Sequence, residues 1–169
     1  HLKLNEIHRQ FSCALTFDEL LGHSQALIII QCILALNQDP SRPYSEGTGW
    51  MLEGVARRLW EQAPVQLPST FTRRHAWLLA ESVRRTIIVA LMLRSAYSLK
   101  TREYSVRTPF VDALPFDVRT TLWDDDSSQA WDELNSASTN SMISLHEYSG
   151  AMENGSVRDV GNFGALILA

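Results

Sequence analysis

The stretch FTRRHAWLLAESVRRTIIVALMLRSAYSLK, residues 71–100, decides the fold of this chain. Apolar residues fill 76–80 and 87–93, and a polar band separates these two runs. Within the band, Glu81 and Arg85 are four residues apart, the spacing at which side chains pair on one face of a helix. We therefore expect one long helix. A helix that is apolar at both ends and striped between them suits the centre of a helical bundle.

The sequence before this stretch predicts three more helices. Residues 2–15 carry apolar residues at steps of mostly three and four, as an amphipathic helix does. The tetrapeptide 16–19, Thr-Phe-Asp-Glu, is a capping box, so a second helix should begin near Phe17 and run to about Asn37. A third helix is predicted from Ser45 to Gln62, with prolines on either side of it.

The second of these helices contains the longest apolar run, from Ala26 to Leu36, which only Gln31 interrupts. The run is much shorter than the ~20 residues that a membrane span needs. We therefore expect a helix that is buried on most of its sides, and no association with a membrane.

The chain after the long helix is predicted to be irregular. Pro109 and Pro115 favour an extended or turned strap over 101–117, which Phe110, Val111, Leu114 and Phe116 could anchor on the bundle, Phe110 and Leu114 above all. Short helical pieces are expected further on, over 118–123, from Ser127 or Ser128 to Leu134, over 142–152, and from Gly164 to the end.

These elements predict an all-α fold, an irregular helical bundle with a proline-containing strap. The interrupted last helix suggests a fragment of a larger helical domain. The expected organisation is a core over 1–134, a Ser/Asn/Thr-rich linker over 135–141, and a tail over 142–169.

The charge of the chain is weakly acidic and unevenly distributed. The formal net charge is −4, which argues against nucleic-acid binding by this segment, because phosphates call for a basic patch. Residues 112–169 hold 10 of the 19 acidic residues and 2 of the 15 Lys and Arg. The simpler interpretation is a solvated acidic surface, and the alternative is an interaction face.

The two cysteines, Cys13 and Cys32, lie inside apolar helical patterns and do not form a disulfide framework. Free thiols of this kind behave as small apolar groups in a reducing compartment. With no visible signal peptide, the chain is expected to be intracellular.

Motifs for catalysis and metal binding are missing from the sequence. It contains no phosphate-binding glycine loop, no HExxH and no GxSxG. The five histidines are scattered along the chain, at His1, His8, His23, His75 and His146. We therefore expect no catalytic, cofactor-binding or metal-binding residues and no enzymatic activity. No ligand-binding residue can be assigned.

The remote enzymatic alternative is a helical terpene synthase, which holds magnesium against a diphosphate with acidic clusters. Asp124–Asp126 resembles the first of these clusters, but Ser128 stands where its third aspartate belongs. The second cluster, sought at Asn140–Ser144, lacks an aspartate and has Glu147 one residue early.

Residues 20–134 resemble the middle regulatory region of fungal binuclear zinc-cluster transcription factors. Glu81, Arg84 and Arg85 match the start of that region's helix motif ExxRR. Its loop motif, DxxLPxD followed by LW, is matched by Leu114, Pro115, Asp117, Leu122 and Trp123, while Asp112 lies one residue closer to Leu114 than the motif places its first aspartate. The chain departs from the family at 87–88, where Ile-Ile replaces Phe-Trp, and at 94–95, where Arg-Ser replaces Asp-Arg.

The resemblance implies a regulatory domain, effector-responsive or autoinhibitory, that controls transcription of a gene set in the nucleus. It implies DNA binding, zinc and a possible homodimer only through a separate N-terminal cluster that this segment lacks. Partners of the segment itself would be a small-molecule effector or a coregulator protein. The alternative from another class is a protein-interaction module that works through the acidic C-terminal half.

Individual residues in the motifs have two interpretations each. Arg84 and Arg85 could grip an anionic effector. The simpler interpretation pairs Arg85 with Glu81 and has Arg84 tie Asp112 and Asp117 to the bundle. The tryptophans could line a ligand pocket, but core packing is the simpler role, particularly for those on apolar helical faces. They are Trp50, Trp60, Trp77, Trp123 and Trp131.

Overall fold

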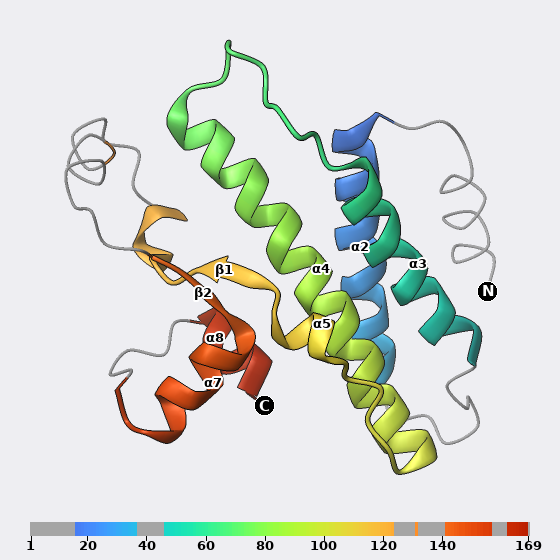
Figure 1. Ribbon diagram of the computed structural model, residues 1–169. Helices are drawn as coiled ribbons and strands as arrows, with labels where there is room; N and C mark the ends of the chain where they lie inside the picture. The colour runs from blue at the N-terminus through green and yellow to red at the C-terminus, as the bar shows by residue number, and fades with distance from the viewer. Residues whose placement is uncertain (1–15, 37–45, 124–130, 132–140, 157–161, 169) are drawn as a thin grey trace. The chain divides into compact units, whose positions relative to one another are not determined.

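The computed structural model describes residues 16–36, 46–123, 131, 141–156 and 162–168. Most of these residues are helical, and the predicted all-α class is confirmed (Figure 1). The elements are α2 (Phe17–Leu36), α3 (Glu46–Gln62), α4 (Arg73–Arg102), α5 (Pro109–Asp112), β1 (Pro115–Asp117), η1 (Thr120–Trp123), β2 (Met142–Ser144), α7 (Leu145–Glu153) and α8 (Asn162–Leu168). The helix predicted over 2–15 lies outside the described residues. So does most of the short helix predicted from Ser127 or Ser128 to Leu134.

The chain forms two compact units. Unit 1 comprises His1–Pro64 and Thr86–Arg107, and unit 2 comprises Val65–Arg85 and Thr108–Ala169. The division falls inside α4, which contributes residues to each unit. This division differs from the organisation predicted from the sequence, in which a linker over 135–141 separates the core from the tail. The linker stays a prediction.

In unit 1, α2 packs against α3. Helix α2 begins where the capping box predicts, because the Thr16 amide donates to the Glu19 carboxylate at 3.0 Å and the Glu19 amide donates to the Thr16 hydroxyl at 3.4 Å. The core contains fully buried leucines and isoleucine, at Leu20, Leu27, Leu52, Leu59 and Ile88. From α4, the buried Tyr97 hydroxyl donates to the Gln31 carbonyl of α2 at 2.7 Å.

Helix α2 is less buried than its composition predicts. Three of its apolar side chains are exposed, with exposed fractions of 59% for Ile29, 52% for Ile33 and 43% for Leu34. The prediction of burial on most sides is therefore wrong. Because α2 is apolar all round, its sequence pattern does not show which face packs against the core.

The segment Phe17–Leu34 of α2 is long and apolar enough to cross a membrane, by length and composition alone, with a mean hydropathy of 1.2. One third of it is buried inside the protein. Core helices of soluble proteins also meet this criterion, so it is weak evidence for a membrane span.

In unit 2, β1 and β2 form a two-stranded antiparallel sheet, in which Phe116 faces Ile143 and Asp117 faces Met142. The strands are three residues long, too short to give a readable alternation in the sequence, and they were not predicted. Helix α7 begins at Leu145 rather than at Met142, because Ser144 is its N-cap and forms a capping box with Glu147.

Three of the four anchors predicted for the strap are buried. Pro109 starts the short helix α5, a position where its missing N–H costs nothing. Val111, Leu114 and Phe116 are buried, whereas Phe110 is 51% exposed. The prediction is confirmed for Val111, Leu114 and Phe116, and the prediction that Phe110 anchors the strap is wrong.

The burial of the tryptophans differs between the two units. In unit 1, Trp50 and Trp60 are 67% and 56% exposed, so core packing is wrong for both. In unit 2, the Trp77 ring makes edge contacts with the rings of Trp123 and Trp131, each at 5.5 Å between centroids. These three are partly buried and pack together, as the simpler interpretation predicts.

Candidate functional site

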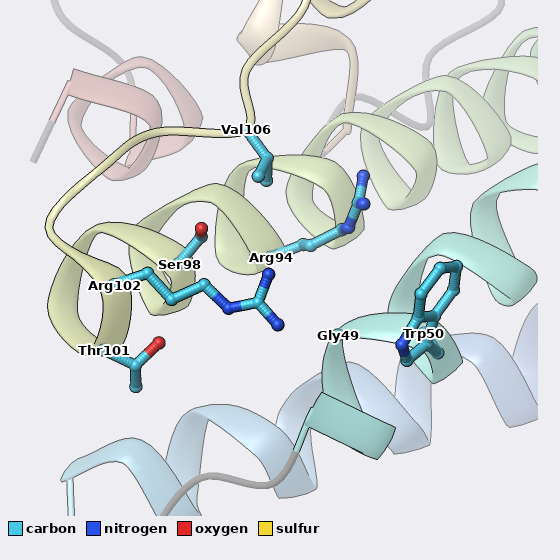
Figure 2. Close-up of a pocket in the computed structure, with 7 residues that line it drawn as sticks. All are labelled: Gly49, Trp50, Arg94, Ser98, Thr101, Arg102 and Val106. Carbon is cyan, nitrogen blue, oxygen red and sulfur yellow. The ribbon is translucent and has the colours of Figure 1, made fainter.

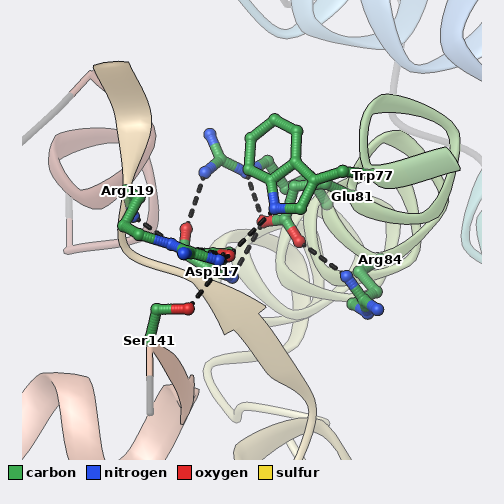
Figure 3. A network of polar contacts seen from close by, with 7 residues as sticks. Trp77, Glu81, Arg84, Asp117, Arg119 and Ser141 are labelled. Carbon is green, nitrogen blue, oxygen red and sulfur yellow. Dashed lines mark hydrogen bonds and ion pairs between the residues drawn. The ribbon is translucent and has the colours of Figure 1, made fainter. Parts of the chain in front are cut away.

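The residues that match the family motifs meet in a buried polar network in unit 2, which Figure 3 shows. Its centre is Glu81 of α4, whose carboxylate is fully buried. Arg85, one turn further along the helix, donates to Glu81 Oε1 at 2.8 Å, and Arg84 donates to Glu81 Oε2 at 2.9 Å. A buried carboxylate needs such partners, because an isolated charge away from water costs several kcal/mol. The two arginines therefore make it possible for α4 to bury Glu81.

The same pair of side chains binds the backbone of strand β1. The Asp117 amide donates to Glu81 Oε1 at 2.9 Å, and the Asp117 carbonyl accepts from Arg85 Nη2, also at 2.9 Å. The next residue, Val118, donates its amide to Ser141, on the side of β2. Because backbone groups of a strand alternate in direction, Glu81 and Arg85 satisfy the edge of β1 that β2 does not pair. Two side chains of α4 thus replace a third strand.

The carboxylate of Asp117 is the second buried acid of the network, with 1% of the residue exposed. Arg119 binds it with its guanidinium and with its backbone amide, and Trp77 Nε1 donates to Asp117 Oδ2 at 2.9 Å. The Ser141 hydroxyl, beside β2, donates to the same oxygen at 3.1 Å. Asp117 therefore joins α4, the strap and the segment before β2.

Opposing effects act on the ionisation of Asp117. Burial raises the pKa of its carboxyl, but the hydrogen bonds from Arg119 and Trp77 stabilise the charged form. Together with the charge of Arg119 they lower the pKa to about 2. Asp117 is consequently ionised at neutral pH despite its burial.

Aromatic rings surround the guanidinium of Arg85. Its Cζ lies 5.1 Å from the centroid of the Trp123 ring and 4.5 Å from that of Phe163. Both distances suit a cation–π interaction. Phe163 also meets Phe116 of β1 edge-on at 5.2 Å, which links the network to the aromatic core of unit 2.

The structure confirms one interpretation of the two arginines and corrects the other. Arg85 pairs with Glu81, as predicted. The prediction that Arg84 ties Asp112 and Asp117 to the bundle is wrong, since Arg84 binds Glu81 and the tie to Asp117 is made by Glu81 and Arg85.

Three members of the network were missed by the sequence analysis: Trp77, Arg119 and Ser141. The spacing of Asp117 and Arg119 gives a weak signal for a local ion pair. Nothing in the sequence marks Ser141, which lies 24 residues from its partner.

Chemically, the network is suited to holding structure. Both carboxylates are buried, and hydrogen bonds within the protein occupy their oxygens. Neither acid therefore offers a carboxylate oxygen for binding a substrate or a metal ion. In the part of the chain that the structure describes, no three His, Cys, Asp or Glu side chains gather as metal ligands; the acidic run Asp124–Asp126 lies outside that part.

Unit 1 contains a cavity of about 300 Å³, shown in Figure 2. Residues of α3 and α4 and of the segment after α4 line it: Gly49, Trp50, Arg94, Ser98, Thr101, Arg102 and Val106. No ligand-binding residue was predicted from the sequence, where Arg94 is notable only as a departure from the family motif. The cavity is an open site at which a small molecule could bind.

Comparison of the chain with protein-family models, with curated proteins and with solved structures gives no match.

Proposed function

We propose that this chain is a regulatory domain of a fungal binuclear zinc-cluster transcription factor, effector-responsive or autoinhibitory, with no chemistry of its own. DNA binding and zinc would belong to a separate region of the protein, and the site of action would be the nucleus. The observation that carries the proposal is that Glu81, Arg85 and Asp117 join in one buried network. All three belong to the motifs on which the resemblance depends.

This observation supports the resemblance in a specific way. A helix motif such as ExxRR can arise from helical packing alone, and a loop motif can arise from turn chemistry alone. Here each motif completes the other, because Glu81 and Arg85 satisfy the backbone of Asp117. The combination of the two motifs thus has a physical reason, which an accidental match would lack.

The proposed mechanism is conformational restraint. An effector or a coregulator that binds one packing of the helices better than another shifts the population toward that packing. The network favours the packing described here, because the loss of one member leaves buried charges without their partners. Weakening it should release the restraint on an attached activation domain.

A transcription reporter tests this proposal. The chain is placed between a heterologous DNA-binding domain and an activation domain, and reporter expression is compared with that of the same fusion without the chain. We expect the wild-type chain to lower expression and Glu81→Gln to restore it several-fold at equal protein abundance.

The matched control is Glu53→Gln, which removes the partly exposed ion pair, 3.1 Å long, between Glu53 of α3 and Arg94 of α4. It should leave the restraint in place. The proposal is wrong if the wild-type chain has no effect on expression, or if both variants change expression equally.

A further inference from the structure

We propose that the cavity in unit 1 binds a small aromatic carboxylate. This inference deepens the proposed function, on which it rests for its biological meaning, by naming the chemical class of the effector. It is carried by a buried serine without a hydrogen-bond partner among the described residues, two arginines and an exposed indole, which line one cavity.

The strongest single observation is Ser98. Its residue is 92% buried, given an exposed fraction of 8%, and its Oγ has no hydrogen-bond partner among the residues that the structure describes. Such a group carries a desolvation cost that a partner would remove. Serine in a helix can bond the carbonyl one turn back, as the nearby Thr101 hydroxyl does with the Tyr97 carbonyl at 2.8 Å. Ser98 does not do so, and a change of rotamer would turn its hydroxyl, whose oxygen is buried, toward a ligand in the cavity that Ser98 lines.

The charge of the cavity lining favours an anion. Arg94, Ser98 and Arg102 recur at four-residue steps, so they share one face of α4, and none of the described lining residues is acidic. Arg94 pairs with Glu53 outside the lining, and Arg102 Nη1 donates to the Tyr104 hydroxyl at 3.1 Å. Because a guanidinium has five N–H donors, Arg102 can bind a carboxylate in addition to Tyr104 and its other contacts within the protein.

The other wall of the cavity suits a flat apolar group. Trp50 is 67% exposed and faces the cavity from α3, and in Figure 2 Arg102 extends toward it. Val106 adds an aliphatic surface. An aromatic ring can stack on the indole while its carboxylate binds Arg102 and the Ser98 hydroxyl.

The volume of the cavity and the electrostatic field around it restrict the class of ligand further. A volume of about 300 Å³ corresponds to roughly ten water molecules, which fits a single-ring acid. The cavity lies along the last turns of α4, where the helix carbonyls carry partial negative charge. This field disfavours a doubly charged phosphate more than a singly charged carboxylate.

Isothermal titration calorimetry on the purified chain tests the proposal, with benzoate as the probe. Benzamide keeps the ring without the charge, and inorganic phosphate keeps the charge without the ring. We expect saturable 1:1 binding of benzoate and at least tenfold weaker binding of the other two compounds.

Three variants locate the site. Arg102→Gln should weaken benzoate binding about tenfold or more. The matched control Lys100→Gln, which removes an exposed charge from the same helix turn outside the lining, should not change it. Ser98→Ala should weaken binding about tenfold without lowering the melting temperature, because the hydroxyl has no partner in the described part of the chain.

The proposal is overturned if benzoate does not bind, if phosphate or benzamide binds equally well, or if Lys100→Gln weakens binding as much as Arg102→Gln. The reporter comparison of Glu81→Gln and Glu53→Gln involves no ligand. Failure of the calorimetry would therefore reject the site and leave the proposed function to be decided by the reporter.

Discussion

The carboxylate of Glu81 accepts the backbone amide of Asp117, 36 residues further along the chain, at 2.9 Å. Through this bond a helix side chain completes the edge of a three-residue strand. Strands of this length have little stability of their own, so contacts outside the sheet decide whether they form. The fold of unit 2 therefore depends on the buried carboxylate of Glu81.

Replacement of Glu81 by Gln should destabilise the fold strongly. The variant keeps the shape of the side chain but leaves Arg84 and Arg85 without their carboxylate in a buried setting. We expect a loss of about 3 kcal/mol in the free energy of unfolding, measured by urea denaturation. Glu53→Gln should cost less than ~1 kcal/mol, because both partners of that ion pair are partly exposed. Equal losses in the two variants would show that Glu81 is not the centre of the network.

Asp117 should make the stability of the protein sensitive to acid. Its folded pKa of about 2 is below the ordinary value of 3.8, so its contribution is fully present above pH ~4 and is lost as the pH falls toward 2. The free energy of unfolding should therefore fall by roughly 2 kcal/mol more in the wild type than in Asp117→Asn over this range. Guanidinium denaturation at pH 4 and pH 2 measures the difference. Parallel losses in the two proteins would contradict the assignment.

Two helical glycines should respond in opposite ways to alanine. A Cβ at Gly164 of α8 would collide with the Tyr148 side chain, so Gly164→Ala should cost roughly 1–3 kcal/mol through overpacking. A Cβ at Gly150 of α7 meets nothing within 4 Å, and Gly150→Ala should stabilise the fold by about 0.5–1 kcal/mol. Thermal unfolding of both variants measures the contrast. A stabilised Gly164→Ala variant would mean that α8 does not approach Tyr148 so closely.

The backbone conformation of Glu103, in unit 1, allows a third substitution to be tested. It follows the last residue of α4 with φ of 62°, and its amide bonds the Leu99 carbonyl at 3.0 Å, which is the geometry of a glycine after a helix. A side chain in this left-handed region costs about 1 kcal/mol. We expect Glu103→Gly to raise the free energy of unfolding by up to that amount. A destabilised variant would indicate that Glu103 makes contacts that outweigh the strain.

The helices were predictable because local chemistry specifies them. The capping box at Thr16 sets the start of α2, and the uninterrupted pattern over 71–100 gives α4 to within two residues at each end. The Glu81–Arg85 pair followed from its spacing alone. In these cases one segment of sequence contains both partners of the interaction.

The remaining features depend on residues far apart in the sequence. The strands β1 and β2 are stabilised by the hydrogen bonds of Asp117 with Glu81 and Ser141. No local sequence pattern predicts these hydrogen bonds. The exposed side of α2 and the exposure of Trp60 depend in the same way on which neighbours are present. The cavity in unit 1 likewise brings Trp50 of α3 to Arg102 of α4.

The central claim is that Glu81 and Arg85 act by holding the backbone of Asp117. Amide hydrogen exchange of Asp117, followed by NMR in the wild type and in Glu81→Gln under conditions where both are folded, tests it most directly. The account predicts a strongly protected amide in the wild type and a large loss of protection in the variant, with the amides of α3 unchanged. A wild-type Asp117 amide that exchanges as fast as an exposed one would contradict it.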